Sequence, residues 1–600
     1  MAETLPTMEV LARIRNNSTS NHAEVFTRLY RYLLRPDVYF AAYKHLYANK
    51  GAATKGINND TVDGFSEEKI ANIIKSLSNE TYSPTPVRRT YIGKKNNSNK
   101  KRPLGIPTFT DKLVQEALRI ILESVYEPIF LDCSHGFRPN KSCHTALKGI
   151  TKGFNGVRWF IEGDIRGCFD NIDHGTLVGL VNNKIKDAKI IKLIYKFLKA
   201  GYMEDWQYYR THSGTPQGGI ISPLLANIYL HELDRFVMKV KSEYDSPPER
   251  VYTPEYSKLQ WQLKTLKERI NKAEPEDRAY LLNEYKQLHS HMLKTPSKSQ
   301  TDKKIKYIRY ADDFLIGVNG NHEDCVEIKR KLTDFIGSVL KMELSEEKTL
   351  TTHSGQKARF LGYDVKVRRN NQVKSDKNGI KKRSLSNMVE LSVPFAEKVN
   401  SFMFRKRIAE QQSDGTLLAV CRPFLLHMTE LEIVSTYNAE LRGICNYYSK
   451  AADFYKLSYF AYLMEYSCLK TLAGKHRTSI SKIVSKYKDG NGKWGIPYKT
   501  KSGTMRCYFA SYSDCKKSEN PSDIKPVNER MHRYSKTSFE NRLQAKTCEL
   551  CGATDNTHYE IHHVHKVKDL KGKHPWEIAM IAKKRKTLVV CRECHHSIHD

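Results

Sequence analysis

The chain has 600 residues, 40% of them hydrophobic, which is enough for about three to five domains with cores of their own. Its 99 Lys and Arg residues outnumber 66 Asp and Glu residues by 33, a surplus that predicts a polyanionic partner, nucleic acid first and an anionic membrane second. The absence of a run of about 18 apolar residues argues against a membrane span, and the N-terminus lacks the pattern of a secretory signal. The 13 cysteines are scattered and do not resemble a disulfide framework. We therefore expect the protein to work in a reducing cytoplasm.

The segment from residue 87 to 230 alternates strand-like and helix-like stretches, with turn signals at 102–105 and 214–219. Within it, the run Trp-Phe-Ile-Glu-Gly-Asp at 159–164 predicts a buried strand that ends in Asp164. Buried strands do not normally end in an acid without a partner charge, so we expect Asp164 to meet another charged group.

Residues 241–304 change to charged, helical sequence. An apolar stripe at spacings of four, three and four predicts one face of an amphipathic helix. We interpret this segment as a helical insertion that packs on its neighbours. The stripe consists of Leu259, Leu263, Leu266 and Ile270.

Strand-like sequence returns at 305–318, where apolar arms flank a Tyr-Ala-Asp-Asp run and place Asp312 and Asp313 at the tip of a β-hairpin. Adjacent acids at a tight turn can be no more than turn formers, but Asp164 supplies a third carboxylate from a second strand. Three such carboxylates can hold two divalent ions about 3.5–4 Å apart, the arrangement that phosphoryl transfer requires. Because hard carboxylate oxygens suit Mg²⁺, the pattern predicts a magnesium-dependent polymerase site.

The region from 391 to 487 is predicted to be helical, because apolar residues recur at spacings of three and four that are typical of a bundle core. Its polar remainder is basic and aromatic, as at 470–477, which suits a groove that follows a nucleic-acid backbone. Residues 489–540 are rich in Gly, Ser and Lys and indicate a loosely packed module or linker that touches nucleic acid. The two apolar stripes are Val434, Tyr437, Leu441, Ile444, Tyr448 and Leu457, Phe460, Met464, Cys468.

A compact module begins at about residue 541 and contains two Cys-x-x-Cys pairs. Four thiolates in such pairs can surround one zinc ion tetrahedrally, in a site closed to substrate. In so short a module the metal would supply much of the folding energy. The expected ligands of this structural Zn²⁺ are Cys548, Cys551, Cys591 and Cys594.

Histidines gather inside and after this cysteine pattern. If the chain is helical from Arg592 onward, His595 and His599 stand four residues apart on one face. They can then converge with a histidine of the strand at 559–564 on a second metal ion. The alternative is a zinc-stapled DNA-binding tail whose histidines have no such role.

Five segments, in order and spacing, resemble the reverse transcriptases of group II introns. Residues 102–107 and 134–139 resemble segments of the fingers, while Asp164, the Pro-Gln-Gly loop at 216–218 and the Tyr-Ala-Asp-Asp hairpin resemble the palm. The resemblance implies a polymerase of the right-hand fold that binds two Mg²⁺ ions. The catalytic, metal-binding residues that it implies are Asp164, Asp312 and Asp313.

The same resemblance implies four contacts to dNTP and template. Arg102 and Arg138 would meet the incoming triphosphate, because guanidinium groups suit phosphate oxygens. Phe169, five residues after Asp164, would be the aromatic gate that selects deoxynucleotides by clashing with a 2′-hydroxyl. Gln217 would lie against the nascent base pair. Plainer roles stay open: a common loop feature for the arginines, a core aromatic for Phe169 and a structural turn at Gln217.

Farther along, the helical region resembles the thumb, called domain X in this family, which binds the intron RNA and assists its splicing. The terminal module resembles an HNH endonuclease of the ββα-metal type. This resemblance implies that His562, His595 and His599 bind one Mg²⁺ or similar divalent ion and that His563 is the general base. At the position of the family's central Asn, this sequence has Thr587. In the family this Asn stabilises the hairpin that orients the general base, so the departure affects the expected efficiency and orientation of cleavage. It removes no metal ligand.

We therefore predict a multidomain α+β protein with four regions, at residues 1–365 (fingers and palm, with the insertion at 241–304), 366–488 (thumb, domain X), 489–540 (small DNA-binding region) and 541–600 (zinc-stapled ββα-metal HNH module). It would bind intron RNA as a ribonucleoprotein, nick double-stranded target DNA and extend the freed 3′ end with dNTPs, in a bacterial cytoplasm and at the nucleoid. A homodimer is left open. The alternatives are a splicing maturase without polymerase activity, which the intact acids disfavour, and a retron or defence-type reverse transcriptase, which the domain X and HNH resemblances disfavour.

Overall fold

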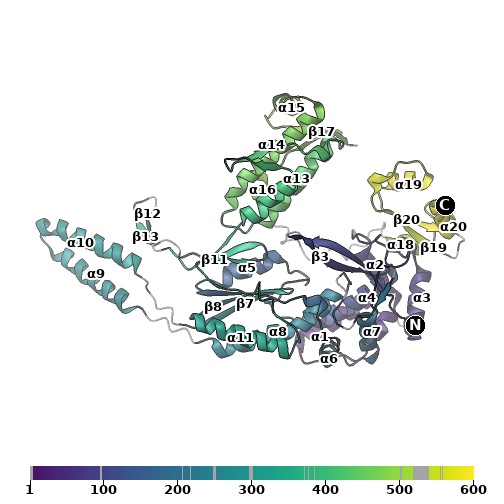
Figure 1. The fold of residues 1–600 in the computed structure, drawn as a ribbon, viewed down its shortest axis with the longest axis horizontal. Helices are drawn as coiled ribbons and strands as arrows, with labels where there is room; N and C mark the ends of the chain where they lie inside the picture. Colours follow the sequence, from purple (N-terminus) through teal and green to yellow (C-terminus); the bar gives the residue numbers. More distant parts are fainter. Residues whose placement is uncertain are drawn as a thin grey trace.

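The structure is a computed structural model that describes residues 5–49, 51–94, 97–205, 207–211, 213–215, 218–246, 252–295, 297, 302–370, 372–375, 378–383, 386–500, 503–517, 539–554, 556 and 558–600. Figure 1 shows a broad body from which a helical arm projects at one end, while a mainly helical region stands above it. The C-terminal module lies beside the N-terminal helices at the other end. Among the helices of these residues, none combines the length and the apolar character needed to cross a membrane.

The N-terminal region is helical and packs around one largely buried helix, α4 (Phe109–Tyr126). Thr108 caps α4 by accepting a hydrogen bond from the backbone N–H of Asp111, and Ser66 caps α3 in the same way. Because most side chains of α4 are buried, it forms the core against which α1, α2 and α8 pack. The other elements here are α1 (Thr7–Ser20), η1 (Tyr30–Leu34), α2 (Pro36–Leu46) and α3 (Glu67–Ser78).

A four-stranded antiparallel sheet forms the centre of the body, in the order β7-β8-β4-β9. β4 (Trp159–Asp164) confirms the predicted buried strand, and β7 (Lys304–Tyr310) and β8 (Asp313–Asn319) confirm the predicted hairpin. Helices α5, α8 and α11 pack against these strands. The remaining bounds are α5 (Cys143–Gly153), α8 (Ser222–Tyr244), α11 (His322–Ser338) and β9 (Thr351–His353).

A second sheet, in the order β3-β2-β5-β6, lies in the segment predicted to mix strands and helices. Its two long strands pair antiparallel with an irregularity at Gly93 and Lys94, whereas β2 and β5 are parallel. The bounds are β2 (Val87–Lys94), β3 (Asn97–Ile106), η2 (Cys168–Asp170), α6 (His174–Lys184), α7 (Ala188–Lys199), β5 (Tyr202–Glu204) and β6 (Gln207–Tyr209).

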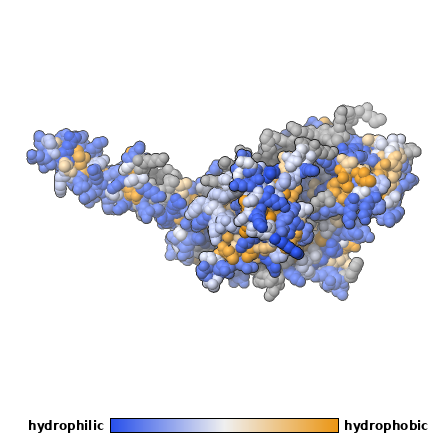
Figure 2. All heavy atoms as spheres, turned by 90° about the horizontal axis from the view of Figure 1, so that it is seen from above, coloured by the Kyte–Doolittle hydropathy of each residue, from blue (hydrophilic) through white to orange (hydrophobic). Residues whose placement is uncertain are grey.

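The predicted insertion is a hairpin of two helices, α9 (Pro254–Lys272) and α10 (Pro275–Lys294). Its apolar stripe is buried, and α9 packs mainly on α10. Figures 1 and 2 show the hairpin as a mostly hydrophilic arm that projects from the body, and α10, which is described in full, has no buried side chain. The insertion was expected to pack on neighbouring elements. In the structure its two helices pack on each other, and α10 also contacts β12 (Val373–Ser375) and β13 (Lys381–Arg383).

Three strands in the order β10-β11-β14 connect the central sheet to the predicted helical region. There α13 packs on α14, and the two predicted apolar stripes are largely buried, as at Tyr437 and Met464. Thr429 and Glu432 form a capping box that begins α13. The bounds are β10 (Ala358–Phe360), β11 (Tyr363–Val367), β14 (Val389–Ser392), the π-helix η3 (Phe395–Asn400), α12 (Ser401–Arg405), β15 (Ala409–Gln411), β16 (Leu417–Ala419), η4 (Pro423–Leu425), α13 (Glu430–Tyr447), η5 (Phe454–Lys456), α14 (Leu457–His476) and α15 (Ile480–Tyr487).

A β-hairpin, β17 (Gly495–Thr500) with β18 (Gly503–Tyr508), occupies the start of the region predicted to be loosely packed. It touches α13, and Trp494 and Ile496 are buried in the same core as α13 and α14. Helix α16 (Tyr512–Lys517) packs on the same two helices, so this part is well packed after all. Residues 501–502 and 518–538 of the region lie outside the described residues.

The C-terminal module forms a sheet that takes its third strand from the N-terminal region, in the order β1-β19-β20. β1 pairs antiparallel with β19, with Phe65 opposite Ile561. The ring of Phe539 lies edge-on to that of Tyr43 in α2 at a centroid distance of 5.0 Å, so module and N-terminal helices share one core. The bounds are β1 (Phe65–Ser66), α18 (Phe539–Gln544), β19 (Tyr559–His563), η7 (Val567–Asp569), α19 (Pro575–Lys583), β20 (Thr587–Cys591) and α20 (Arg592–His599).

Candidate active sites

The three predicted polymerase acids meet at one end of the central sheet. Asp164 ends β4 and lies directly opposite Asp313, the first residue of β8, while Asp312 sits in the turn that joins β7 to β8. Burial, contact with Asp164 and the charge of Asp312 raise the pKa of Asp313 well above its usual value, and burial together with the charge of Asp164 raises the pKa of Asp312. Carboxylates crowded in this way favour a partner of high positive charge, and hard divalent cations such as Mg²⁺ fit the donor set.

Two backbone features shape the turn that carries these acids. Ala311 adopts a left-handed conformation with φ 56°, which a residue other than glycine keeps only where its surroundings hold it there. Gly136 passes so close that a Cβ at this position would lie 2.3 Å from the Ala311 nitrogen. Space alone therefore requires glycine in the His-Gly-Phe segment, since any side chain would displace the turn.

A buried polar cluster beneath the turn holds Ala311 in place. The guanidinium of Arg309 pairs with Asp234 of α8 at 2.6 Å, and both side chains are 0% exposed. The same guanidinium donates hydrogen bonds to the Ala311 carbonyl at 2.9 Å, to Ser134 Oγ at 2.9 Å and to Asn227 Oδ1 at 3.3 Å. The ion pair thus joins the turn, the loop before Gly136 and helix α8.

A lysine that the sequence patterns did not indicate lies against the acids. Lys348 Nζ is 2.6 Å from Asp164 Oδ2. Burial opposes the charge of this lysine, but the contact with Asp164 and the charges of Asp313 and Asp312 outweigh it and raise its pKa. Lys348 follows two glutamates in a charge run typical of an exposed surface. Only the fold reveals that it balances charge at the acids.

Of the four predicted nucleotide contacts, one, Arg102, lies within electrostatic reach of the acids. Arg102 is exposed on β3. Its positive charge acts to lower the pKa of Asp312, but burial raises this pKa by more. Phe169 is half-buried in η2, and its ring lies edge-on to that of Phe137 at a centroid distance of 6.2 Å. Gln217 lies outside the described residues.

A cavity of about 450 Å³ opens beside Phe169 and the second sheet. Thr215, whose backbone N–H donates to the Phe169 carbonyl at 2.7 Å, lines it together with Asp170. Arg89 and Arg210 bring positive charge to the same walls. The cavity has the size and the charge to take a nucleotide or a nucleic-acid phosphate.

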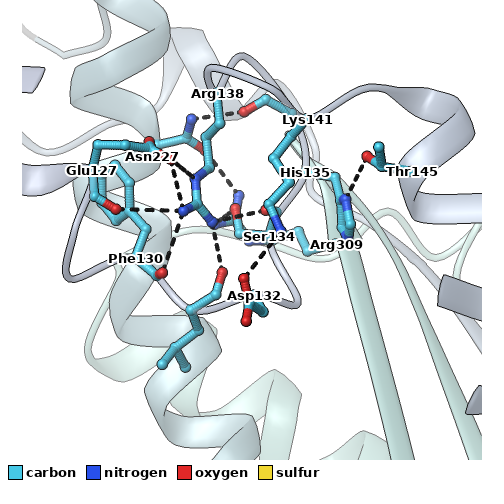
Figure 3. Close-up of polar contacts among 12 residues, drawn as sticks. Glu127, Phe130, Asp132, Ser134, His135, Arg138, Lys141, Thr145, Asn227 and Arg309 are labelled. Carbon is cyan, nitrogen blue, oxygen red and sulfur yellow. Dashed lines mark hydrogen bonds and ion pairs between the residues drawn. The ribbon is translucent and has the colours of Figure 1, made fainter. Parts of the chain in front are cut away.

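The position of Arg138 corrects the sequence interpretation. Figure 3 shows its guanidinium enclosed by the loop that precedes it. Glu127 accepts from Nε and Nη2, and three loop carbonyl oxygens accept the remaining N–H groups at 2.6–3.3 Å. All five donors of the guanidinium are therefore in use, and the side chain is only 5% exposed. Arg138 stabilises the loop that leads to Gly136, in place of the expected contact with a triphosphate.

The four predicted zinc ligands come together, with their sulfur atoms within 4.8 Å of one another. The Sγ atoms of Cys551 and Cys591 are 3.8 Å apart. A tetrahedral site with Zn–S bonds of about 2.3 Å has sulfur atoms about 3.8 Å apart, so the spacing fits zinc. Cys548 Sγ also accepts the backbone N–H of Cys551 at 3.4 Å, which stabilises its thiolate.

The predicted histidine cluster also forms, with one addition. His562 of β19 and His595 and His599 of α20 offer ligand atoms within 4.8 Å of one another, and Asp63 from the N-terminal region completes the group. Glu560 Oε2 lies 2.5 Å from His595 Nδ1 and so leaves Nε2 of that ring for a metal. His562 is buried; its Nδ1 faces Asp63 Oδ1 at 3.3 Å without hydrogen-bond geometry, and among the described residues its Nε2 has no partner. A divalent ion suits nitrogens placed in this way.

His563, the predicted general base, follows this cluster in β19. Burial lowers its pKa to about 4, so the ring is neutral near pH 7 and can accept a proton. Its backbone pairs with Thr587 of β20, the position that corresponds to the family's Asn. The Thr587 hydroxyl accepts a hydrogen bond from Arg542 at 2.8 Å, and in the described part of the chain both ring nitrogens of His563 lack a partner.

The functional residues missed from the sequence differ in the signal they leave. Arg309 stands on the inward face of β7, in alternation with Ile305 and Tyr307, so an arginine at a core position was a detectable signal of a buried ion pair. Asp63 leaves no such signal, because it precedes His563 by 500 residues and no local pattern relates the two.

Comparison with known proteins supports the same three activities. Family models match residues 92–252 (reverse transcriptase, RNA-dependent DNA polymerase), 387–536 (type II intron maturase) and 548–595 (AI2M/AI1M-like HNH endonuclease). The maturase match extends past residue 488, as does the core shared with β17 and β18.

Relatives match over most of the chain. The group II intron-encoded protein LtrA of Lactococcus lactis subsp. cremoris is 60% identical over 597 residues, 99% of each chain. An uncharacterized 91 kDa protein in the cob intron of Schizosaccharomyces pombe is 36% identical over 95% of this chain and 69% of its own. Nuclear intron maturase 1, mitochondrial, of Arabidopsis thaliana is 25% identical over 63% of this chain and 58% of its own.

Proposed function

The chain belongs to the group II intron-encoded proteins, which combine a reverse transcriptase, a maturase and an HNH endonuclease, and from this premise we propose which residues carry each activity. It is an RNA-directed DNA polymerase with an HNH DNA endonuclease, and it serves the splicing and mobility of a group II intron. Binding of the intron RNA follows from its maturase region.

We assign the polymerase chemistry to Asp164, Asp312 and Asp313, in the palm of a right-hand fold. The observation that carries this assignment is the strand register, which sets Asp164 opposite Asp313 with Asp312 in the adjoining turn. Two Mg²⁺ ions held by these acids would activate the primer 3′-oxygen and neutralise the departing pyrophosphate. The chain itself supplies positioning: Arg309 fixes the turn, and Lys348 adds positive charge at Asp164.

For the incoming nucleotide we propose a pocket of the fingers and palm that includes Arg102, Phe169 and Gln217. Arg102 is near enough to influence Asp312 electrostatically, and Phe169 is followed by Asp170, which lines a cavity that also carries Arg89 and Arg210. Arg102 would bind the triphosphate, Phe169 would exclude a ribose 2′-hydroxyl, and Gln217 would support the base pair. Arg138 is left out, because its donors are already used.

The regions proposed for these activities are 1–365 for fingers and palm, 366–488 for the thumb, 489–540 for DNA contacts and 541–600 for the ββα-metal nuclease. The thumb assignment is supported by exposed aromatic rings on α14, where Tyr459, Tyr462 and Tyr466 follow one another on the surface. Exposed rings of this kind stack on unpaired bases, and the surplus of 33 positive charges attracts the phosphate backbone.

For the nuclease we propose that Zn²⁺ on the four cysteines stabilises the module and that a divalent ion on three histidines serves DNA cleavage. That ion would polarise the scissile phosphate and stabilise the leaving oxygen. His563 would take a proton from the attacking water, a role that suits a ring kept neutral near pH 7. Nicking of double-stranded target DNA would free the 3′ end that the polymerase extends. The proposed ligands of the second ion are His562, His595 and His599.

Primer extension on an RNA template tests the polymerase assignment. Asp312→Asn and Asp313→Asn should each abolish extension, whereas Glu323→Gln, an exposed carboxylate on α11, should leave it unchanged. If wild type and both Asn variants extend equally little, the chain is a maturase without polymerase activity. Sequencing of RNA that co-purifies with the protein tests the partner: recovery of no intron-like RNA would exclude the intron assignment.

A further inference from the structure

The N-terminal region reaches directly into the proposed nuclease site. Asp63 stands in the turn before β1, the strand that extends the nuclease sheet. The turn is anchored by the backbone N–H of Gly64, which donates to the Ile561 carbonyl at 3.1 Å, and Gly64 takes a positive φ of 73° that favours glycine. Phe65, next in the chain, stacks on Tyr43 with ring centroids 3.9 Å apart. Asp63 is thus held in place from both sides.

Two of the three distances around Asp63 match those of a metal-binding group. Its Oδ1 lies 3.3 Å from His562 Nδ1 and 3.3 Å from His595 Nε2, and its Oδ2 lies 2.7 Å from His599 Nε2. A tetrahedral site with bonds of about 2.0–2.1 Å to nitrogen and oxygen has ligand atoms about 3.3–3.4 Å apart. By its spacing from His562 and His595, Oδ1 therefore suits the place of a fourth ligand, while Oδ2 contacts His599 at a hydrogen-bond distance.

The same segment covers the proposed general base. Asp63 Oδ1 accepts the backbone N–H of His563 at 2.7 Å, and the ring of Tyr47 lies edge-on to that of His563 at a centroid distance of 6.5 Å. Both ring nitrogens of His563 are buried. A base so covered cannot reach an attacking water while the N-terminal region stays docked.

A metal site with four protein ligands is closed, whereas a catalytic site keeps one position open for water or substrate. We propose that Asp63 is the fourth ligand of the nuclease ion and that, by filling the position needed by the scissile phosphate, the docked N-terminal segment keeps the nuclease closed in the free protein. The proposal rests on the proposed nuclease function and extends it to regulation. Withdrawal of the segment opens the coordination position and uncovers His563 together.

Cobalt binding and DNA nicking by the full-length protein test this proposal. The protein carries zinc on its four cysteines, Co²⁺ is titrated as the probe, and its visible absorption reports occupancy of the histidine site. Asp63→Asn retains the acceptor for the His563 N–H and so preserves docking; Asp63→Ala is the second variant, because an Asn oxygen can still bind metal. Glu68→Gln is the matched control, since Glu68 lies on the same docking face but pairs with His558 outside the cluster.

We expect both Asp63 variants to weaken Co²⁺ binding about tenfold or more and, at saturating Co²⁺, to nick supercoiled plasmid about tenfold faster than wild type, a usual size for coupling between two sites. Glu68→Gln should match wild type in both assays. Co²⁺ affinity within twofold of wild type in both Asp63 variants would overturn the proposal, and so would nicking no faster than wild type at saturation. His562→Ala combined with Asp63→Ala separates the two hypotheses: if this double variant nicks as fast as Asp63→Ala alone, the nuclease assignment itself fails.

Discussion

Removal of one partner of the Arg309–Asp234 pair should destabilise the polymerase body more than removal of both. The two side chains are 0% exposed and 2.6 Å apart, so Asp234→Asn leaves a buried guanidinium without its counter-charge. Breaking a pair of this kind costs about 3–5 kcal/mol of unfolding free energy. Combining Arg309→Met with Asp234→Leu removes both buried charges but leaves the Tyr307 hydroxyl and the Ala311 carbonyl without these partners, so we expect the double variant to recover only part of the lost stability.

The double variant should nevertheless be a poor polymerase. Arg309→Met removes the guanidinium that donates to the Ala311 carbonyl at 2.9 Å, and a misplacement of about 1 Å at the reacting groups can cost about 100-fold in rate. Urea unfolding and steady-state primer extension on the same preparations measure the two effects, with Glu323→Gln as the control. The reasoning fails if Asp234→Asn loses less than about 1 kcal/mol, or if the double variant keeps the wild-type kcat.

Cys591→Ser should reduce the zinc content by one ion per chain and lower the melting temperature of the C-terminal module, because structural zinc supplies its folding energy; native mass spectrometry and calorimetry measure both, and an unchanged zinc content would contradict the site. Phe169→Ala should raise ribonucleotide incorporation relative to dNTP by about 10–100-fold in primer extension, and unchanged selectivity would make Phe169 a core residue. Glu127→Ala should cost about 3 kcal/mol by leaving Arg138 buried without its ion pair, with no change in KM for dNTP; a raised KM would return Arg138 to the nucleotide site. Burial lowers the pKa of His135 from 6.5 to about 4, so between these pH values the unfolded chain takes up a proton that the folded chain does not. Stability present above pH 6.5 should therefore fall toward pH 4 by about 3 kcal/mol at most, and His135→Asn should flatten this part of the curve obtained by urea unfolding.

Sites whose residues are close in sequence could be predicted well. The acids at the hairpin tip and each Cys-x-x-Cys pair carry their spacing within a few residues, so local geometry constrains where the side chains point. Asp164 required a tertiary argument, and the rule that a buried acid needs a partner charge was sufficient for it. The insertion was predicted as a helix from its apolar stripe, but a stripe does not reveal whether its partner is the body or a second helix of the same arm.

Arg138 and Asp63 mark where such reasoning ends. The sequence of an arginine beside a proline is the same whether the guanidinium donates to a triphosphate or to the carbonyl groups of its own loop. Only the folded chain shows which acceptors are within hydrogen-bond distance. Asp63 lies in a segment of Asn, Asp and Gly residues typical of a turn. Its meeting with the histidines depends on strand pairing across nearly the whole chain, which no periodicity encodes.

The position of the nuclease relative to the polymerase has a physical basis in the N-terminal core. Tyr43 contacts both Phe65 beside the nuclease sheet and Phe109 at the start of α4. On α4, Gln115 Oε1 accepts the backbone N–H of Ile220 at 2.8 Å. Two sites joined only by a flexible linker would sample many separations, whereas sites built on one packed core keep a defined one. In the docked state the nuclease therefore stands at a defined distance from the polymerase acids, and the withdrawal of the N-terminal segment proposed above would release this constraint when the nuclease opens.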